Sequence, residues 1–90
     1  MKVVKIHYDD DFEEQFLKLP KNIQKKAFKA EALFRQNTFH PSLRLHKLEG
    51  KLKEHWSISL DKKYRIMFKI MNDGVILFIS IGLHSIYEKN

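Results

Sequence analysis

Hydrophobic and polar residues alternate along much of the second half of the chain. In HWSISL (55–60) and YRIMFKI (64–70) every second residue is apolar, which is typical of strands with one buried face. VILFISI (75–81) is apolar except at Ser80 and predicts an inner strand covered on both sides. The segment NDG (72–74) between the last two strands predicts a tight hairpin turn, because its residues tolerate positive φ.

The first part of the chain predicts a strand followed by a helix. KVVKIHY (2–8) is short and rich in β-branched residues, as strands are. Asp10, followed three residues later by Glu13, forms a capping-box pattern and predicts a helix with Asp10 as its N-cap. Leu19-Pro20 predicts the end of that helix, because proline disfavours the helical conformation of the residue before it.

A second helix is predicted over KNIQKKAFKAEALFRQN (21–37), whose apolar residues recur at helical spacing while its lysines lie largely on other faces. The two helices should form a hairpin lying on the sheet. TFHPSLRLHKLEGK (38–51) contains Pro41 and Gly50 and predicts an irregular connection. The order β-α-α-β-β-β therefore predicts one α+β domain over residues 1–90, an antiparallel sheet with an N-terminal helical hairpin packed on one face.

The charge balance favours a polyanionic or acidic partner. Lysine plus arginine number 17 against 11 acidic residues, which gives a formal net charge of +6, and such a field raises encounter rates with nucleic acid. A lysine-rich solvated surface without a partner is the alternative. The chain has no cysteine, which removes disulfides, thiolate metal ligands and a cysteine nucleophile. The histidines show no H-x-x-x-H or H-x-H spacing and no cysteine can assist them, so no metal site is expected. No other cofactor is predicted.

The apolar segments favour a cytoplasmic protein with no membrane contact. MKVVKIHYDDD (1–11) lacks the apolar run of a signal peptide, because Lys5 and His7 interrupt it. The longest nearly uncharged stretch, GVILFISIGL (74–83), is too short to span a bilayer as a helix.

One permanent cation, Arg65, lies in the most strand-like segment. Alternation places Arg65, Met67 and Lys69 opposite the helices. No predicted helix covers that face, so we expect an open surface with two cations in front of Met67 and Phe78. The alternative is an exposed strand face with ordinary basic residues.

Further polar residues are predicted to lie near Arg65. The hairpin pairing brings the start of one strand, at Arg65, beside the end of the other, where His84 follows a bend at Gly82. His46 comes at the end of the irregular connection, just before the sheet, and Tyr87 comes three residues after His84.

Four short motifs follow one another in this half of the chain: H-x-L-x-G (46–50), W-S-I (56–58), Y-R-I-x-F (64–68) and I-G-x-H (81–84). None is diagnostic alone, but the ordered set resembles the RelE/ParE superfamily of bacterial toxins. Within it, the resemblance is to the YoeB-, YafQ- and HigB-like members. It covers nearly the full chain, because the length and the order of the elements agree as well.

This resemblance implies the toxin of a type II toxin–antitoxin system, a metal-independent endoribonuclease that cuts mRNA in the ribosomal A site and so inhibits translation. The ribose 2′-hydroxyl attacks the adjacent phosphorus and the 5′-oxygen leaves, which gives a 2′,3′-cyclic phosphate. That reaction needs a base, an acid and a fixed cation. Histidine, with an unperturbed pKa of about 6.5, suits the first two roles, and arginine offers phosphate a planar donor fork.

The resemblance also assigns roles by position. His46 stands where YoeB-like toxins have a glutamate and YafQ-like ones a histidine, and becomes the general base. Arg65 becomes the cation that stabilises the transition state, and His84 the general acid. Tyr87 becomes the aromatic residue that stacks on or orients the nucleotide; its alternative role is packing against Ile86.

Each of the other roles has a structural alternative. In the structural alternative, His46 is a loop histidine without a catalytic role, and Arg65 forms a surface ion pair with Glu54 or Asp61. His84 is then a partly buried histidine at the edge of the sheet.

The resemblance is incomplete on the strand at 55–60. RelE-type members carry lysines there, where this chain has Ser57 and Ser59. YafQ-like enzymes use a histidine on this strand, but His55 has no firm counterpart among them. The RNA phosphates are expected to be bound by other lysines: Lys47, Lys51, Lys53 and Lys69.

Two other functions are compatible with the same resemblance. A ParE-type toxin poisons DNA gyrase by binding, cuts nothing and needs no pair of histidines. A degenerate toxin would serve only as a scaffold for its antitoxin. Both active forms imply a cognate antitoxin, a small protein whose toxin-binding segment is acidic.

Overall fold

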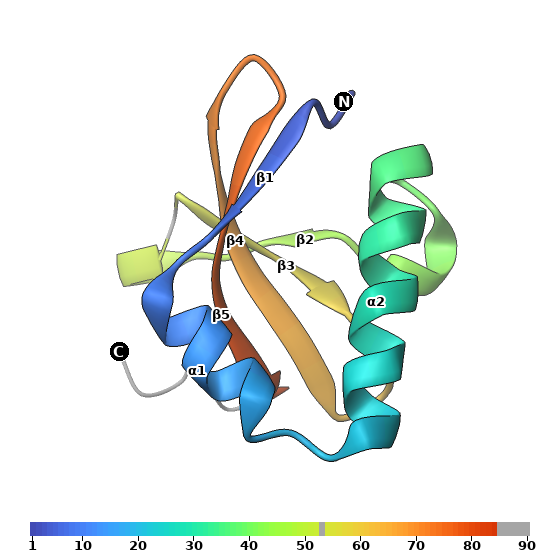
Figure 1. The fold of residues 1–90 in the computed structure, drawn as a ribbon. Helices are drawn as coiled ribbons and strands as arrows, with labels where there is room; N and C mark the ends of the chain where they lie inside the picture. The colour runs from blue at the N-terminus through green and yellow to red at the C-terminus, as the bar shows by residue number, and fades with distance from the viewer. Residues whose placement is uncertain (53, 85–90) are drawn as a thin grey trace.

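The computed structural model describes residues 1–52 and 54–84 and confirms the α+β class (Figure 1). Its elements are β1 (Lys5–Tyr8), α1 (Asp10–Leu17), α2 (Lys21–Gln36), β2 (His46–Lys47), β3 (His55–Ser59), β4 (Tyr64–Asn72) and β5 (Val75–Leu83), with the short 3₁₀ turns η1 (Pro41–Leu43) and η2 (Gly50–Leu52). The strands form one sheet in the order β1-β5-β4-β3-β2. Strand β5 is thus an inner strand, as predicted.

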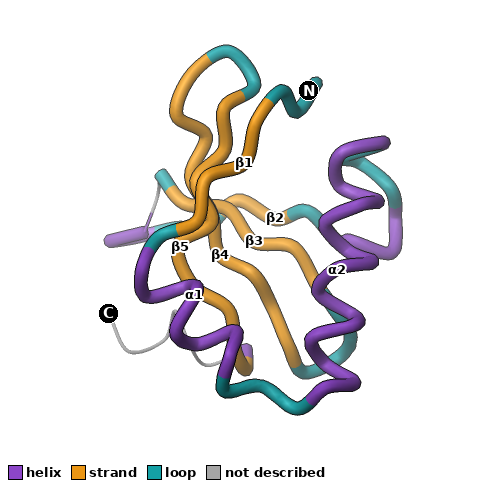
Figure 2. The backbone as a smooth tube through the Cα atoms, in the orientation of Figure 1, coloured by secondary structure: helices purple, strands orange, loops and turns teal. Residues whose placement is uncertain are grey.

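Strand β1 joins the sheet in parallel to β5, whereas the other neighbours are antiparallel. The helices lie between β1 and the remaining strands in the sequence and connect the two parts of the sheet. Figure 2 shows the α1–α2 connection at one end of the molecule and the β4–β5 hairpin, with the N-terminus near it, at the other. No helix of the described residues is both long and apolar enough to cross a membrane.

Helix α1 begins one residue earlier than the capping pattern predicts. The N-cap is Asp9, whose carboxylate accepts a hydrogen bond from the backbone N–H of Asp11 at 3.2 Å, so the prediction of Asp10 is wrong. Asp10, Asp11 and Glu13 then lie in the first turn, where negative charge favours the exposed N–H groups. The tight N-cap explains the abrupt change from β1 to α1.

The two helices are joined at their meeting point by one side chain. The amide of Gln24, near the start of α2, donates to the carbonyl oxygens of Phe16 and Leu19 at 3.1 and 3.2 Å. The Phe16 carbonyl also accepts from the backbone N–H of Leu19 at 3.1 Å, so Gln24 adds a further bond to the C-terminal end of α1. Gln24 therefore helps to fix the helical hairpin that the sequence predicts.

Aromatic rings fill the space between the helices and the sheet. Phe34 of α2, Phe68 of β4 and Phe78 of β5 are each 0% exposed, and their ring centroids lie between 5.1 and 6.2 Å apart. Phe12 of α1 extends this cluster, with its ring 5.4 Å from that of Phe78. The core of the protein thus lies on one side of the sheet.

A β-bulge in β5 decides which residues face that core. Phe78 pairs with Phe68, but Met67 pairs with Ser80, so Ile79 is an extra residue in the ladder. Without the extra residue, strict alternation would place Phe78 and Ser80 on one face. The prediction that Phe78 lies on the face opposite the helices is wrong because of this bulge.

The face opposite the helices is less open than the sequence suggests. Met67, Ser57, Ser59 and Ser80 are between 3% and 8% exposed, and Lys69 is only half-buried beside them. The hydroxyl oxygen of Ser80 is buried without a hydrogen-bond partner among the described residues. The expected bare surface is therefore wrong for the middle of this face.

The β4–β5 turn has the predicted conformation. Asp73 and Gly74 have φ angles of 31° and 84°, both in the left-handed region. A side chain at Gly74 would also collide with the backbone oxygen of Lys2, and the backbone N–H of Val4 donates to the Gly74 carbonyl at 2.8 Å. Glycine is thus required here both for the turn and for the close approach of the N-terminal segment.

Candidate active site

The register of the sheet confirms the predicted proximity of Arg65 to the end of β5. Arg65 pairs with Gly82 on one side and with Ser59 of β3 on the other. Strand β5 runs on through Gly82 to Leu83, so the predicted bend at Gly82 is wrong. The backbone N–H of His84 then donates to the Lys63 carbonyl at 2.8 Å, which keeps His84 beside the start of β4.

The short strand β2 lies within the segment that the sequence predicts to be irregular. It pairs antiparallel with β3, and His46 lies opposite Ser57 while Lys47 lies opposite Trp56. Side chains of paired residues share a face, so His46 lies on the face of Arg65. Lys47 lies on the other face, with its ammonium 5.8 Å from the centroid of the Trp56 ring, a cation–π contact.

A hollow of about 540 Å³ lies where β2, β3, β4 and the end of β5 meet. Its lining residues are Arg44, Leu45, His46, Ser57, Ser59, Arg65 and His84. The structure thus brings together three of the four predicted catalytic residues, whereas Tyr87 lies outside the described residues. Two guanidiniums, two imidazoles and two hydroxyls with no carboxylate make a site suited to an anion.

The guanidinium of Arg65 is held by backbone carbonyls. Its Nη1 donates to the carbonyl oxygens of Asp61 at 2.7 Å and Tyr64 at 3.0 Å. Neither bond involves a carboxylate, so the ion pair with Asp61 or Glu54 is not formed within the described residues. These bonds orient the group and leave its Nε and Nη2 hydrogens for a bidentate ligand.

The turn that holds Arg65 is itself fixed by a carboxylate. Asp61 Oδ1 accepts from the backbone N–H groups of Lys63 and Tyr64, both at 2.8 Å, and Oδ2 accepts from Lys26 of α2 at 2.9 Å. Burial raises the pKa of Asp61, but the bonds from Lys26, Tyr64 and Lys63 outweigh it and lower the pKa to about 2. Asp61 is therefore ionised at neutral pH and keeps the turn closed.

The three predicted RNA-binding lysines that the structure describes do not line the hollow. Lys47 lies on the opposite face, Lys51 is exposed in η2, and Lys69 lies beside His55, two rows along the sheet from Arg65. Lys53 lies outside the described residues. His55, the other histidine of this region, pairs with Lys69 and does not line the hollow.

Arg44 is the charged lining residue that the sequence analysis missed as a functional candidate. The signal in the sequence is only the position of Arg44, a permanent cation two residues before His46. It was obscured because the segment 38–51 carries no strand pattern. Among residues 1–52 and 54–84, no three His or acidic side chains gather as metal ligands would.

The whole described sheet and both helices fall within a match to a known family model. Residues 2–84 match the model described as "RelE-like toxin of type II toxin-antitoxin system HigB". The chain belongs to the HigB-like family of RelE-like toxins. It is therefore a toxin of a type II toxin–antitoxin system, as the motif resemblance implies. No curated protein is similar enough to the chain to count as a match.

Solved structures share the fold of this HigB-like toxin at low sequence identity. The YoeB/ParE toxin from Agrobacterium tumefaciens has a TM-score of 0.76 at 13% identity, over 90% of this chain and 99% of that one. YafQ from Escherichia coli has a TM-score of 0.73 at 19% identity, over 89% and 92%. The E. coli DinJ–YafQ toxin–antitoxin complex gives 0.71 at 19% identity, over 94% and 96%. These likenesses establish the RelE-like fold.

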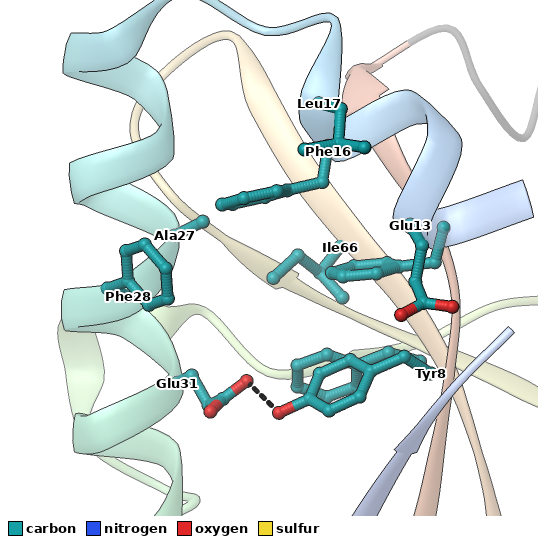
Figure 3. Close-up of a pocket in the computed structure, with 10 residues that line it drawn as sticks. Tyr8, Glu13, Phe16, Leu17, Ala27, Phe28, Glu31 and Ile66 are labelled. Atoms are coloured by element: carbon teal, nitrogen blue, oxygen red, sulfur yellow. Dashed lines mark hydrogen bonds between the residues drawn. The ribbon is translucent and has the colours of Figure 1, made fainter. Parts of the chain in front are cut away.

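A second hollow, on the helix side of this HigB-like toxin, has a different character. It measures about 350 Å³ and is lined mainly by apolar side chains of α1, α2 and the sheet, among them Phe16 and Phe28 (Figure 3). At its edge the hydroxyl of Tyr8 donates to Glu31 Oε1 at 2.6 Å. Burial and the neighbouring Glu31 raise the pKa of Tyr8. This hollow has carboxylates but no lining cation, so it does not suit a phosphate.

Proposed function

We propose that this HigB-like toxin is a ribosome-dependent, metal-independent mRNA endonuclease that inhibits translation by cutting mRNA in the ribosomal A site. The observation that carries the proposal is the hollow shared by His46, Arg65 and His84. It combines two imidazoles, the side chain most often used as a general acid or base, with a permanent cation held by carbonyl oxygens.

In the proposed reaction, His46 removes the proton of a ribose 2′-hydroxyl as its oxygen bonds to the adjacent phosphorus. The bond from phosphorus to the 5′-oxygen breaks, and His84 gives that oxygen a proton. The products are a 2′,3′-cyclic phosphate and a 5′-hydroxyl, so no water or metal is consumed. Each positioned acid or base contributes about 10²- to 10⁴-fold.

Arg65 stabilises the charge that develops on the phosphorane-like transition state. Its Nη1 is occupied by the carbonyls of Asp61 and Tyr64, so the group arrives already oriented and little reorganisation is needed. The remaining Nε and Nη2 edge matches two phosphate oxygens.

Residues outside the hollow have secondary roles in this proposal. Tyr87 stacks on or orients the nucleotide, as the resemblance implies. Lys47, Lys51, Lys53 and Lys69 bind RNA phosphates away from the scissile bond, since the described ones do not line the hollow.

The proposed partners are a cognate antitoxin, the ribosome and mRNA. DinJ–YafQ is a toxin–antitoxin complex of a structurally similar protein, which supports an antitoxin for this chain. The net charge of +6 favours an acidic antitoxin segment and an RNA target.

The test is primer extension on an mRNA incubated with the toxin in a purified translation system. The same mRNA is also incubated with the toxin after the ribosomes are left out. We expect cuts within codons only when ribosomes are present. His84→Ala should lower the cleavage rate at least about 100-fold. His7→Ala is the matched control, because His7 is exposed on β1 and does not line the hollow.

Two outcomes would contradict this proposal. If His84→Ala arrests growth fully while mRNA stays whole, the protein acts by binding, as a ParE-type gyrase poison does. If expression of the wild type causes no growth defect, the protein is only a scaffold for its antitoxin.

A further inference from the structure

We propose that Arg44 is a second substrate-binding cation, which grips the phosphodiester backbone of the RNA across the hollow from Arg65. This inference rests on the proposed function for its substrate class. Among the described residues that line the hollow, Arg44 and Arg65 are the ones with a permanent positive charge. The site would otherwise face a polyanion with a single fixed cation.

The backbone of Arg44 is the first observation. Its φ and ψ are 47° and 50°, the left-handed conformation, at the end of η1. Apart from Arg44, the described non-glycine residue with positive φ is Asp73, in the hairpin turn. Glycine, asparagine and aspartate adopt this conformation readily, whereas arginine does so at a cost. An arginine at a position suited to glycine indicates that its side chain is used, since strain of this kind gathers at functional sites.

The surroundings of the side chain are the second observation. Arg44 is exposed and forms no ion pair with a described carboxylate. No acidic residue lines the hollow either. The positive charge of Arg44 is therefore not neutralised by this part of the chain and is available to an anionic ligand.

The placement relative to Arg65 is the third observation. Arg44 precedes β2, and Arg65 lies on β4, with β3 between them. Two strand spacings amount to about 10 Å, a gap that two arginine side chains can close from opposite sides. Ser57 and Ser59 of β3 line the hollow between them, so their hydroxyls offer further hydrogen bonds to the same backbone.

Arg65 alone is also partly committed. Its Nη1 already donates to two carbonyl oxygens, which leaves one fork for the scissile phosphate. A second guanidinium allows the site to bind another oxygen of the RNA backbone. The Nε and Nη2 edge of Arg65 then stays bonded to the oxygens of the reacting phosphate. Arg44 thus acts mainly in binding, and its loss should raise KM more than it lowers kcat.

Arg44→Gly separates this role from a structural one. The substitution removes the guanidinium but suits the left-handed backbone, so the unfolding temperature should stay the same or rise. Binding to a single-stranded RNA that carries 2′-O-methyl groups, and so cannot be cleaved, is followed by fluorescence anisotropy at several salt concentrations. We expect Kd to rise about tenfold or more and the salt slope to fall by about 0.7, the value for one phosphate contact on a single strand.

Asp73→Gly is the matched control. It relieves backbone strain at the other described non-glycine residue with positive φ, which does not line the hollow. Its Kd should stay equal to that of the wild type or fall slightly, since a negative charge is lost. Arg44→Lys should recover most of the salt slope but less of the affinity, because an ammonium lacks the planar fork.

Binding and cleavage keep this inference distinct from the proposed function. If Arg44→Gly weakens RNA binding but the wild type cuts no mRNA, Arg44 is confirmed as an RNA-binding residue while the nuclease proposal fails. If Arg44→Gly keeps the wild-type Kd and salt slope, or if the wild type binds no RNA, the inference is overturned.

Discussion

Strands β4 and β5 contribute Phe68 and Phe78 to one face of the sheet and Met67 and Ser80 to the other. On the helix side the two aromatic rings are fully buried and pack on Phe34. On the other side the same strands carry the buried hydroxyl of Ser80. The hollow around Arg65 lies on this side, where β4 begins and β5 ends. One pair of strands therefore serves stability on one face and holds the candidate chemistry on the other.

The two hollows repeat this difference. The one between the helices has an aromatic and aliphatic lining with glutamates at its edge, whereas the one beside β2 has arginines, histidines and serines. The first can accept an apolar side chain but repels an anion; the second attracts an anion and offers little apolar surface. The two hollows differ because they lie on opposite faces of the same sheet and are lined by side chains that point in opposite directions.

The largest predicted effect is on the helix side. Phe78→Ala should lower the free energy of unfolding by about 3–5 kcal/mol, because it removes a buried ring and leaves a cavity. A domain of this size has only about 5–15 kcal/mol to lose, so the variant should unfold at a much lower urea concentration. The measurement is urea denaturation followed by circular dichroism.

Phe28→Ala is the control for this prediction. Phe28 is 64% exposed, and its truncation should change stability by no more than about 0.5 kcal/mol. Equal losses for the two variants would show that the aromatic cluster does not stabilise the protein in the way that its burial suggests.

Much of this division between faces could be predicted from the sequence. Alternation predicts that Ile66 and Phe68 face the helices and that Arg65 faces away from them, and the structure agrees, because period-two patterns hold wherever a strand is regular. The Asp-Gly turn fixed the pairing of β4 with β5, and hence the position of Arg65 beside the end of β5.

The rest depended on features that periodicity does not carry. The extra residue Ile79 turns Phe78 toward the helices. In a strand that is apolar apart from Ser80, the period-two pattern is too weak to mark such a bulge. Strand β2 is only two residues long and is defined by its pairing with β3, so no local pattern predicts it. Arg44 was missed for the same reason, since its role follows from a left-handed backbone and from neighbours distant in sequence.

A smaller effect, of opposite sign, is predicted on the other face. The hydroxyl oxygen of Ser80 is buried without a partner among the described residues, and such a group destabilises the folded state. Ser80→Ala removes it with little change in volume and should raise the free energy of unfolding by up to about 1 kcal/mol. Urea denaturation would measure the gain. A loss of 1 kcal/mol or more would mean that this hydroxyl does stabilise the fold, and that the two faces differ less than we infer.

The smallest predicted effect concerns the contact between the helix layer and the turn that holds Arg65. Lys26 of α2 and Asp61 form an ion pair at 2.9 Å whose side chains are 45% and 24% exposed, so solvent screens it and its loss should cost only about 0.5–1 kcal/mol. Asp61→Asn removes the charge but keeps an oxygen that can accept from the N–H groups of Lys63 and Tyr64. At neutral pH the variant should therefore be slightly less stable than the wild type.

The pH dependence of that difference identifies its cause. The folded pKa of Asp61, about 2, lies below its ordinary value of 3.8, so the stability that the ionised carboxylate contributes is complete above about pH 4 and is lost as the pH falls through 2. Urea denaturation at a series of pH values should show wild type and Asp61→Asn converging over that window. Glu14→Gln, which breaks an ion pair with Lys18 whose side chains are 70% and 75% exposed, should show almost no difference at any pH. Curves for Asp61→Asn that stay parallel to the wild type down to pH 2 would mean that the carboxylate holds the turn through its hydrogen-bonding shape alone, and that the helix layer does not stabilise the Arg65 site through charge.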